Sequence, residues 1–355
     1  MKPRPHKRED EPTLDADRLL SLIDACARRR VVVVGDLMAD EFVYGRVERV
    51  SREAPVLILR HDATIVTPGG AGNAANNVAA LGGRVVLAGV AGRDDEGRRM
   101  LDTLHPRVSR RAVVQVAGHP TPVKTRILAG GVHSAKQQIV RVDRVFNGTL
   151  PPDVRQRIAR AARTAAASAD AILVSDYGLG TVTDRLVTSL LHAARGRRGR
   201  QKPVLMDSRH AATAFAGVTA CTPNESEVEQ LLGVRIGDDR QALEQAGREM
   251  LRRTRAQAVL ITRGGRGMAL FEPRQPTRHI PIYGSDEVAD VTGAGDTVIA
   301  AMTLALTGGA TFYEAARLAN YAGGLVVMKQ GTATVSADEL REAVRRDFGR
   351  RAATR

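Results

Sequence analysis

A glycine-rich turn and an aspartate stand immediately before a long apolar run, VIAAMTLAL, and this combination can do chemistry. The run predicts a buried helix, so the N–H groups of Gly293, Ala294 and Gly295 would lie unpaired at its N-terminus, where a phosphate binds well. Asp296 would lie beside this anion hole as an ionised carboxylate, because an unperturbed aspartate has a pKa of ~3.9. Such a pair suits phosphoryl transfer to a hydroxyl. The alternative is a simple turn in which Asp296 caps the helix.

Three further segments carry residues of related types. GGAGNAANN at 69–77 combines glycines, which allow close approach to the backbone, with an asparagine that can donate and accept hydrogen bonds. TPNESE at 222–227 places polar side chains at the start of a predicted helix, and TRGGRG at 262–267 follows an apolar strand. No G-x-x-x-x-G-K-[ST] segment occurs, so the phosphate grip is not of the Walker type.

Together the motifs resemble the signatures of the ribokinase-like (PfkB) carbohydrate kinases, in family order over roughly residues 30–340. DVTGAGDT at 290–297 is similar to the second family signature, GGAGNAANN to the first, and the N-x-x-E of 224–227 to the element that organises phosphate and magnesium. The resemblance implies a sugar kinase that uses ATP and Mg²⁺, with K⁺ as a further cofactor. Asp296 would be the base that activates the acceptor hydroxyl.

Four other segments resemble the heptose-7-phosphate kinase branch of this family: GDLMAD at 35–40, SREAP at 51–55, QQIVRVD at 137–143 and SDY at 175–177. This resemblance implies phosphorylation of the anomeric C1 hydroxyl of D-glycero-β-D-manno-heptose 7-phosphate to the 1,7-bisphosphate, for ADP-heptose and lipopolysaccharide synthesis. Many relatives carry a nucleotidyltransferase with an H-x-G-H motif. That motif is absent from these 355 residues, so a stand-alone kinase is expected.

The sequence departs from the family pattern in three places. Lysine is common in relatives after the SDY segment, where this chain has Gly178-Leu179-Gly180, and at the position of Arg209. An acidic residue that is usual between Thr262 and Gly264 is also missing.

Side-chain chemistry and the resemblance together predict the residues of each subsite. The acceptor sugar phosphate is assigned to Asp36, Gly69, Gly70, Asn73, Lys124, Arg126, Gln137 and Arg141. ATP is assigned to Asn224, Glu227, Thr262, Gly264, Gly267, Asn320 and Gly323. Glu227 is also expected to hold Mg²⁺ through water, and Asp290 and Thr292 to form a potassium site. Each assignment has a structural alternative. Asp36 could simply form a turn, the glycine–asparagine segment could cap a helix, and Asn224 and Glu227 could cap the start of another. The lid residues Lys124, Arg126, Gln137 and Arg141 could lie on a solvated strand face, and 262–267 could be a plain hairpin turn.

Short apolar runs alternate with helical patterns along the chain, which predicts an α/β fold with a doubly wound, mostly parallel sheet flanked by helices. The predicted strands are 31–34, 84–89, 171–174, 203–206 and 257–262. One predicted helix starts at the glycines of 69–72 and runs to 82, and the others are 13–28, 94–104, 151–168, 183–194, 225–232, 239–254, 293–307, 311–328 and 336–346.

Two stretches, 41–66 and 110–142, contain strand patterns without an intervening helix and predict a small β-sheet lid over the strand ends. The alternative is hairpin decoration with no part in closure. The expected domain is 13–345, between a disordered basic tail at 1–12 and a second basic tail at 346–355. Because exposed sheet edges invite pairing, a homodimer joined through the lid strands is expected.

The overall composition narrows the class of protein. Apolar residues make up 43%, there are only two cysteines, and the first ten residues lack an apolar stretch, so a cytoplasmic protein with no secretory signal or membrane span is expected. The net charge of +14 could suit a polyanion, but the arginines are dispersed without interleaved aromatics, so no nucleic-acid partner is expected. Two rivals stay open: another sugar or sugar-phosphate kinase of the same family, and a basic nucleic-acid-binding protein on a kinase scaffold.

Overall fold

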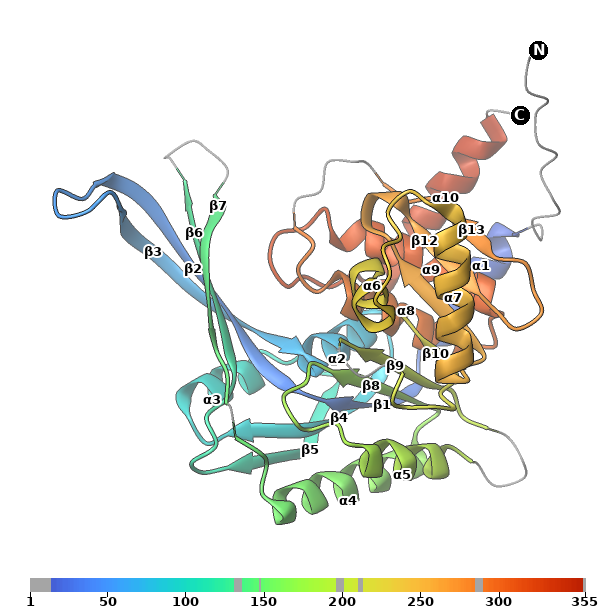
Figure 1. Ribbon diagram of the computed structural model, residues 1–355, viewed down its shortest axis with the longest axis horizontal. Coiled ribbons are helices and arrows are strands. Elements are labelled where there is room, and N and C mark those ends of the chain that lie inside the picture. Colours follow the sequence, from blue (N-terminus) through green and yellow to red (C-terminus); the bar gives the residue numbers. More distant parts are fainter. Residues whose placement is uncertain are drawn as a thin grey trace.

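The computed structural model describes residues 14–130, 136–146, 148–195, 201–209, 213–284 and 290–353. In these residues the chain forms one large and one small β-sheet (Figure 1). The large sheet has nine strands, in the spatial order β13 (Arg278–Ile280), β12 (Met268–Phe271), β11 (Ala258–Thr262), β10 (Ala220–Cys221), β9 (Val204–Ser208), β8 (Ala171–Asp176), β1 (Arg30–Gly35), β4 (Arg84–Gly92) and β5 (Val108–Val116). The pairs from β11 to β5 are parallel, whereas β12 and β13 add antiparallel at one edge. The predicted doubly wound, mostly parallel sheet is thus confirmed.

Helices cover both faces of the large sheet, because each central strand is apolar on both sides. Val31 and Val33 point to one core, while Val32 and Val34 point to the other. The first core is packed by α1 (Ala16–Cys26), α2 (Ala71–Ala80), α3 (Asp95–Asp102), α8 (Ala294–Thr307), α9 (Phe312–Val326) and α10 (Ala337–Ala353). The second is packed by α4 (Pro152–Ser168), α5 (Asp184–Ala194), α6 (Glu225–Leu232) and α7 (Arg240–Thr254). No helix in the described ranges has the length and apolar character that crossing a bilayer requires.

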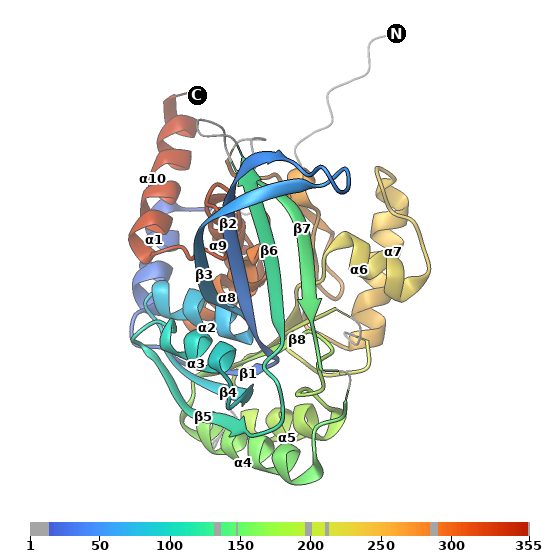
Figure 2. The ribbon, with the colours of Figure 1, turned by 90° about the vertical axis from the view of Figure 1, so that its left-hand side faces the viewer.

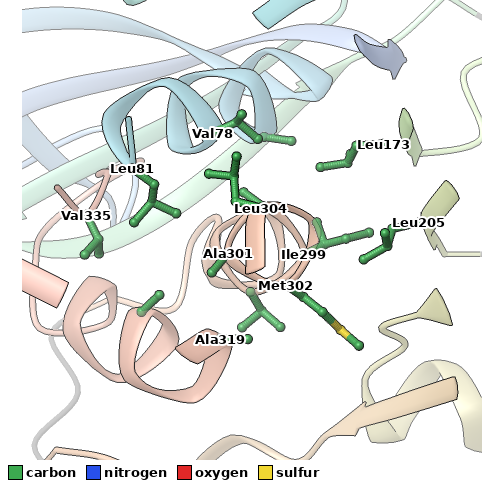
Figure 3. Close-up of a cluster of buried hydrophobic side chains, with 14 of the residues drawn as sticks. Val78, Leu81, Leu173, Leu205, Ile299, Ala301, Met302, Leu304, Ala319 and Val335 are labelled. Atoms are coloured by element: carbon green, nitrogen blue, oxygen red, sulfur yellow. The ribbon is translucent and has the colours of Figure 1, made fainter. Parts of the chain in front are cut away.

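Helix α8 lies at the centre of the first core, as its apolar sequence predicts. Figure 3 shows its side chains between Val78 of α2, Leu173 and Leu205 of the sheet, and Ala319 of α9. Ten of its fourteen residues are buried, so the helix has no polar face turned to solvent. This packing fixes the N-terminal turn of α8 rigidly against the sheet.

The small sheet, which corresponds to the predicted lid, has four strands in the order β3 (Leu57–Gly70), β2 (Leu37–Val50), β6 (Val123–Gly130) and β7 (Gln137–Arg144). Figure 2 shows the four strands side by side, and Figure 1 shows that the β2–β3 hairpin projects well beyond the large sheet. Strands β2 and β3 pair antiparallel, β2 and β6 parallel, and β6 and β7 antiparallel.

Three predicted boundaries are wrong. The segment 112–117, assigned to the lid, belongs to β5 and pairs with β4 at the edge of the large sheet. The tail predicted from 346 is helical as far as Ala353, because α10 continues past the predicted end. The strands β12 and β13, which follow the 262–267 loop, were not predicted. The tail predicted at 1–12 lies outside the described residues.

Candidate active site

Asp296 is buried in the first turn of α8, where two side chains from other elements hold its carboxylate. The residue is only 2% exposed. Nδ2 of Asn73, on α2, donates to Oδ2 at 2.8 Å. The hydroxyl of Tyr177, which follows β8, lies 3.1 Å from Oδ1 and 3.2 Å from Oδ2. The carboxylate is therefore oriented by donors from two separate parts of the chain.

Burial also sets the acidity of this carboxylate. Desolvation raises the pKa of Asp296 from 3.8 to about 7, and the negative charge of Asp40 acts in the same direction. The hydrogen bonds from Asn73 and Tyr177 and the positive charge of Arg209 lower the pKa and offset part of that rise. The ordinary acidic pKa expected from sequence is therefore wrong. A carboxylate that titrates near neutrality is well suited to act as a general base.

The turn before α8 presents backbone amides as its glycines predict. Gly293 has a φ of 77°, and a Cβ there would lie 2.4 Å from Nδ2 of Asn73. The N–H of Ala294 bonds back to the carbonyl of Val291 at 3.2 Å, but within the described chain the N–H groups of Gly293 and Gly295 meet no acceptor. The predicted set of three free amides is thus reduced to two. No side chain caps this helix, which argues against the capping alternative for Asp296.

A row of side-chain hydrogen bonds links α2 to α8. The hydroxyl of Thr297 donates to Oδ1 of Asn77 at 2.9 Å, and Nδ2 of Asn77 donates to Oδ1 of Asn73 at 3.0 Å. Both polar atoms of Asn73 are therefore engaged with the protein. Asn73 thus orients the carboxylate of Asp296, and its predicted sugar contact stays a prediction.

Asp36 lies at the end of β1, beneath the loop that carries Tyr177. It is 1% exposed, and its carboxylate accepts three backbone N–H groups. Oδ2 accepts from Tyr177 at 2.9 Å and Leu179 at 3.0 Å, and Oδ1 accepts from Thr181 at 3.0 Å. These bonds hold the loop that follows β8 in place, and they thereby position the Tyr177 hydroxyl that bonds to Asp296. Asp36 thus anchors this loop, and its predicted sugar contact stays a prediction.

Asp40, on β2, is an acceptor-side carboxylate that the sequence analysis did not assign. Nη1 of Arg126 pairs with its Oδ1 at 2.6 Å, and both side chains are less than a tenth exposed. A Cβ on Gly69 would lie 2.4 Å from Asp40 Oδ2, and one on Gly70 would lie 2.6 Å from the carbonyl oxygen of Asp36. Glycine is therefore required at both positions by neighbouring protein atoms, and the predicted contact of Gly69 and Gly70 with a sugar stays a prediction. Arg126 is paired with the carboxylate of Asp40, and its predicted phosphate contact stays a prediction.

The other predicted lid residues differ in where they lie. Nζ of Lys124 lies 5.0 Å from the centre of the Tyr177 ring, which brings it to the site. Burial, followed by the nearby charge of Arg209, lowers the pKa of Lys124. Arg141 is exposed and pairs with Asp143 at 2.9 Å. Gln137 is exposed at the start of β7, where it pairs with Ala129 near the end of β6. The structure gives neither of these two residues a place at the site.

All seven predicted nucleotide residues line one cavity of about 390 Å³. They are Asn224 and Glu227 of α6, Thr262, Gly264 and Gly267 of the loop after β11, and Asn320 and Gly323 of α9. Apolar walls come from Met268, Ile282, Val298 and Val327, and the amide turn at 293–295 closes one end. An apolar pocket that ends at free amides suits a nucleotide with its base in the pocket and its phosphates at the turn.

Asn224 and Glu227 form a reciprocal capping box at the start of α6. Each side chain accepts the other residue's backbone N–H at 2.9 Å, as the capping alternative predicted. Both still line the cavity, so capping and ligand binding are compatible. Asp207, at the end of β9, was not predicted. Burial, and then the charges of Glu227 and Asp296, raise its pKa well above the usual value.

The nucleotide loop is tied to α6 by two arginines. Arg263 stands where the family resemblance predicts an acidic residue, and its Nε pairs with Glu225 at 2.6 Å. Arg266 pairs with the other carboxylate oxygen of Glu225 at 2.5 Å. The positive charges are therefore neutralised outside the cavity, and the departure from the family pattern does not place a cation among the loop glycines.

Asp290 fastens the turn that precedes α8. Its Oδ1 accepts the N–H of Thr292 at 2.9 Å, and its Oδ2 accepts the N–H of Gly331 at 3.0 Å. Over the described ranges, no three His, Cys, Asp or Glu side chains are grouped closely enough to hold a metal ion by themselves. The potassium site at Asp290 and Thr292 therefore stays a prediction.

The functional residues missed from sequence are Asp40, Tyr177, Asp207 and Arg209. Three of them directly follow, or end, strands of the large sheet, and the carboxyl ends of parallel strands meet at one edge. Their position at the carboxyl ends of predicted parallel strands was therefore the feature of the sequence that could have identified these three residues. Some of their partners, by contrast, lie far away in the sequence: the hydroxyl of Tyr177 bonds to Asp296, which is 119 residues further along the chain.

Comparison with known proteins agrees with this geometry. A model of the pfkB family of carbohydrate kinases matches residues 28–339. The bifunctional protein HldE of Gluconacetobacter diazotrophicus is 41% identical over 312 residues, which cover 87% of this chain and 62% of that protein. The chain thus spans less than two thirds of the length of this relative.

Solved structures share the fold at lower identity. Arabidopsis thaliana ribokinase complexed with ribose and ATP matches with a TM-score of 0.67 and 21% identity, over 90% of this chain and 99% of that one. Phosphofructokinase-2 of Escherichia coli, in complex with potassium, also matches with a TM-score of 0.67, at 20% identity and the same coverage.

Proposed function

The chain belongs to the pfkB family of carbohydrate kinases, and from that premise we propose that it transfers the γ-phosphoryl group of ATP to the C1 hydroxyl of D-glycero-β-D-manno-heptose 7-phosphate. The observation that carries the proposal is the buried carboxylate of Asp296 beside the amide turn that closes the nucleotide cavity. The similarity to HldE and the SDY and QQIVRVD segments support a heptose phosphate as the acceptor. The 1,7-bisphosphate product would serve ADP-heptose and lipopolysaccharide synthesis.

In the proposed reaction, Asp296 accepts the proton of the acceptor hydroxyl while the hydroxyl oxygen attacks the γ-phosphorus. The N–H groups of Gly293 and Gly295 hold the charge that develops on the transferred group. Asn73 and Tyr177 keep the carboxylate turned toward the cleft. Closure of the lid over the cleft would exclude water and so suppress wasteful ATP hydrolysis.

The residues present fit a magnesium ion bound together with ATP. The charge of Glu227 raises the pKa of Asp207, after the larger effect of burial, and a divalent cation held near these carboxylates and the phosphates would relieve that repulsion. Magnesium usually keeps several waters and takes few protein ligands, which agrees with a site of only two carboxylates. When bound, it would neutralise charge on the β- and γ-phosphates. We also propose Asp290 and Thr292 as the place at which a potassium ion would steady the turn.

The acceptor is tested by a substrate panel. Purified protein with Mg²⁺ and ATP is offered heptose 7-phosphate, fructose 6-phosphate, fructose 1-phosphate and ribose, and ADP release is measured. We expect kcat/KM to be at least ~10²-fold higher for heptose 7-phosphate, because sites that bind a specific polar group reject analogues lacking it. NMR of the product should show phosphate on C1. Equal or better turnover of another sugar would overturn the heptose assignment but leave the kinase assignment intact.

A second prediction concerns pH. Because the pKa of Asp296 is raised to about 7, kcat should fall about tenfold per pH unit below that value, as the base becomes protonated. The hydrogen bond from Tyr177 lowers this pKa, so Tyr177→Phe should move the acid limb to higher pH while nearly normal turnover returns at pH 9. The measurement is kcat at saturating substrates between pH 5.5 and 9.5.

The control for this experiment is Tyr44→Phe, which removes a tyrosine hydroxyl from the lid at a residue that stacks on Phe42. Its pH profile should match the unmodified protein. An unchanged acid limb in Tyr177→Phe would show that the hydroxyl of Tyr177 does not tune the base.

A third prediction concerns assembly. The lid ends in two unpaired edge strands, β3 and β7, and most of the exposed large apolar side chains lie on lid strands or their connections: Val47, Val50, Val56, Leu57, Ile65, Ile139, Val140 and Val142. Exposed edges with apolar side chains favour pairing with a second copy of the chain.

We propose a homodimer joined through the lid. The double variant Val50→Lys/Leu57→Lys, which charges a pair of cross-strand neighbours, should convert it to a monomer.

Light scattering coupled to gel filtration gives the mass directly. The matched control is Val234→Lys, at an exposed valine outside the lid, which should leave the dimer intact. A monomer in the unmodified protein at micromolar concentration would contradict the proposal, as would a dimer that survives the double substitution.

A further inference from the structure

Arg209, which follows β9, is a cation at the site to which no role has yet been given. Its guanidinium carbon lies 4.4 Å from the centre of the Tyr177 ring, and the residue lines the nucleotide cavity beside Gly293 and Gly295. The side chain is exposed. Among the described residues, no carboxylate comes within ion-pair distance of it.

The way Arg209 is held sets it apart from the other arginines near the cleft. Arg126 is neutralised by Asp40, and Arg263 by Glu225. Arg209 lies on the face of Tyr177 without a carboxylate partner among the described residues, and stacking on a ring orients a guanidinium without using its N–H donors or its charge. Its donors therefore stay available for an anionic ligand, and a guanidinium binds phosphate oxygens in a bidentate manner.

The location of Arg209 links the two halves of the site. The ring that supports it belongs to the residue whose hydroxyl bonds to Asp296. Its positive charge lowers the pKa of Asp296, on the acceptor side, and that of Asp207, on the nucleotide side. The cation thus lies within electrostatic reach of both carboxylates. The space between them is where a phosphoryl group would pass from nucleotide to acceptor.

We propose that Arg209 binds the γ-phosphoryl group of ATP during its transfer and stabilises the charge of the transition state. The proposal rests on the phosphotransferase function proposed above. In this step the bond from the γ-phosphorus to the β–γ bridging oxygen breaks, and a bond to the acceptor oxygen forms. Asp296 takes the hydroxyl proton, and Arg209 exchanges no proton, because its N–H groups donate to the non-bridging oxygens throughout. Tyr177 serves as the platform that positions the guanidinium.

Lys124 approaches the same ring from the lid and has a different expected task. Its Nζ lies 5.0 Å from the ring centre and belongs to the element that covers the acceptor. We assign Lys124 to the distal phosphate of the acceptor. The two cations are therefore distinguishable, since Lys124→Ala should raise KM for the sugar phosphate and Arg209→Ala should lower kcat.

The test compares Arg209→Ala, Arg209→Lys and the control Arg235→Ala, which removes an exposed arginine elsewhere. Turnover is measured at pH 9, where Asp296 is ionised in every variant. Removing one preorganised transition-state donor costs about 10²–10³-fold in kcat, so Arg209→Ala should lose that much with KM values changed only a few-fold. Arg209→Lys keeps the positive charge but lacks the planar guanidinium that binds two phosphate oxygens at once, so it should restore only part of the lost kcat. Arg235→Ala should behave as the unmodified protein.

A second readout is independent of the identity of the sugar. Calorimetric titration with MgADP is run with and without aluminium fluoride, which mimics a transferring phosphoryl group. The gain in affinity due to aluminium fluoride should be lost in Arg209→Ala, while MgADP alone binds normally and so reports a folded site. A retained gain, an unchanged kcat, or an effect confined to the acceptor KM would overturn the role of Arg209. If the unmodified protein phosphorylates no sugar, the proposed function fails, and this titration still decides whether Arg209 binds the phosphoryl group.

Discussion

Replacing Asp296 by asparagine should lower kcat by at least ~10²-fold, the low end of what removal of a general base costs. Asparagine has nearly the same shape and can still accept the hydrogen bond of Tyr177, but it cannot take the hydroxyl proton. MgATP affinity should change little, because the nucleotide cavity is lined by the adjacent turn and not by the carboxylate itself. The measurement is kcat from ADP release together with calorimetric binding of MgADP.

The pH profile adds an independent check on the same variant. The acid limb expected near pH 7 belongs to Asp296, so it should be absent from the residual activity of Asp296→Asn. The exposed Asp153→Asn serves as a matched control and should keep both the rate and the limb. Turnover within a few-fold of the unmodified protein would refute the role of Asp296.

The fold was largely predictable because its signals are local. Parallel strands covered on both faces appear as short all-apolar runs such as 31–34, and α8 appears as a nearly continuous apolar helix. The segment 112–117 was misplaced because an alternating strand indicates a buried face without indicating which sheet it joins. Burial of β5 comes from its pairing with β4 and its contact with α4, which the sequence pattern does not record.

The positions of the site residues were more predictable than their roles. The glycine and aspartate types around Asp296 identify a phosphate turn, and the residues assigned to ATP do line one cavity. The roles of Asn73 and Asp36 depend on partners 223 and 141 residues or more away, which no local pattern specifies. The pKa of Asp296 likewise depends on burial by several elements, so its rise to about 7 could not be predicted from the motif.

Asp36 gives the second large effect and separates the two roles suggested for it. Asp36→Ala would leave the N–H groups of Tyr177, Leu179 and Thr181 without their acceptor at a position that is 1% exposed. A buried donor left unsatisfied costs about 1–3 kcal/mol, and three donors lose their acceptor here. We therefore expect the free energy of unfolding in urea to fall by about 3–5 kcal/mol. Turnover should fall about tenfold or more, because Tyr177 no longer holds Asp296.

The matched control is Asp239→Ala, since Asp239 also accepts two backbone N–H groups, at the start of α7, but is exposed. Its loss should cost about 1 kcal/mol, as for an ordinary helix cap, and leave turnover unchanged. If Asp36 instead served as a sugar contact, Asp36→Ala would raise KM for the acceptor and cost no more stability than Asp239→Ala. The difference between the two variants in urea therefore decides between a residue that binds the sugar and one that holds the loop beneath the catalytic carboxylate.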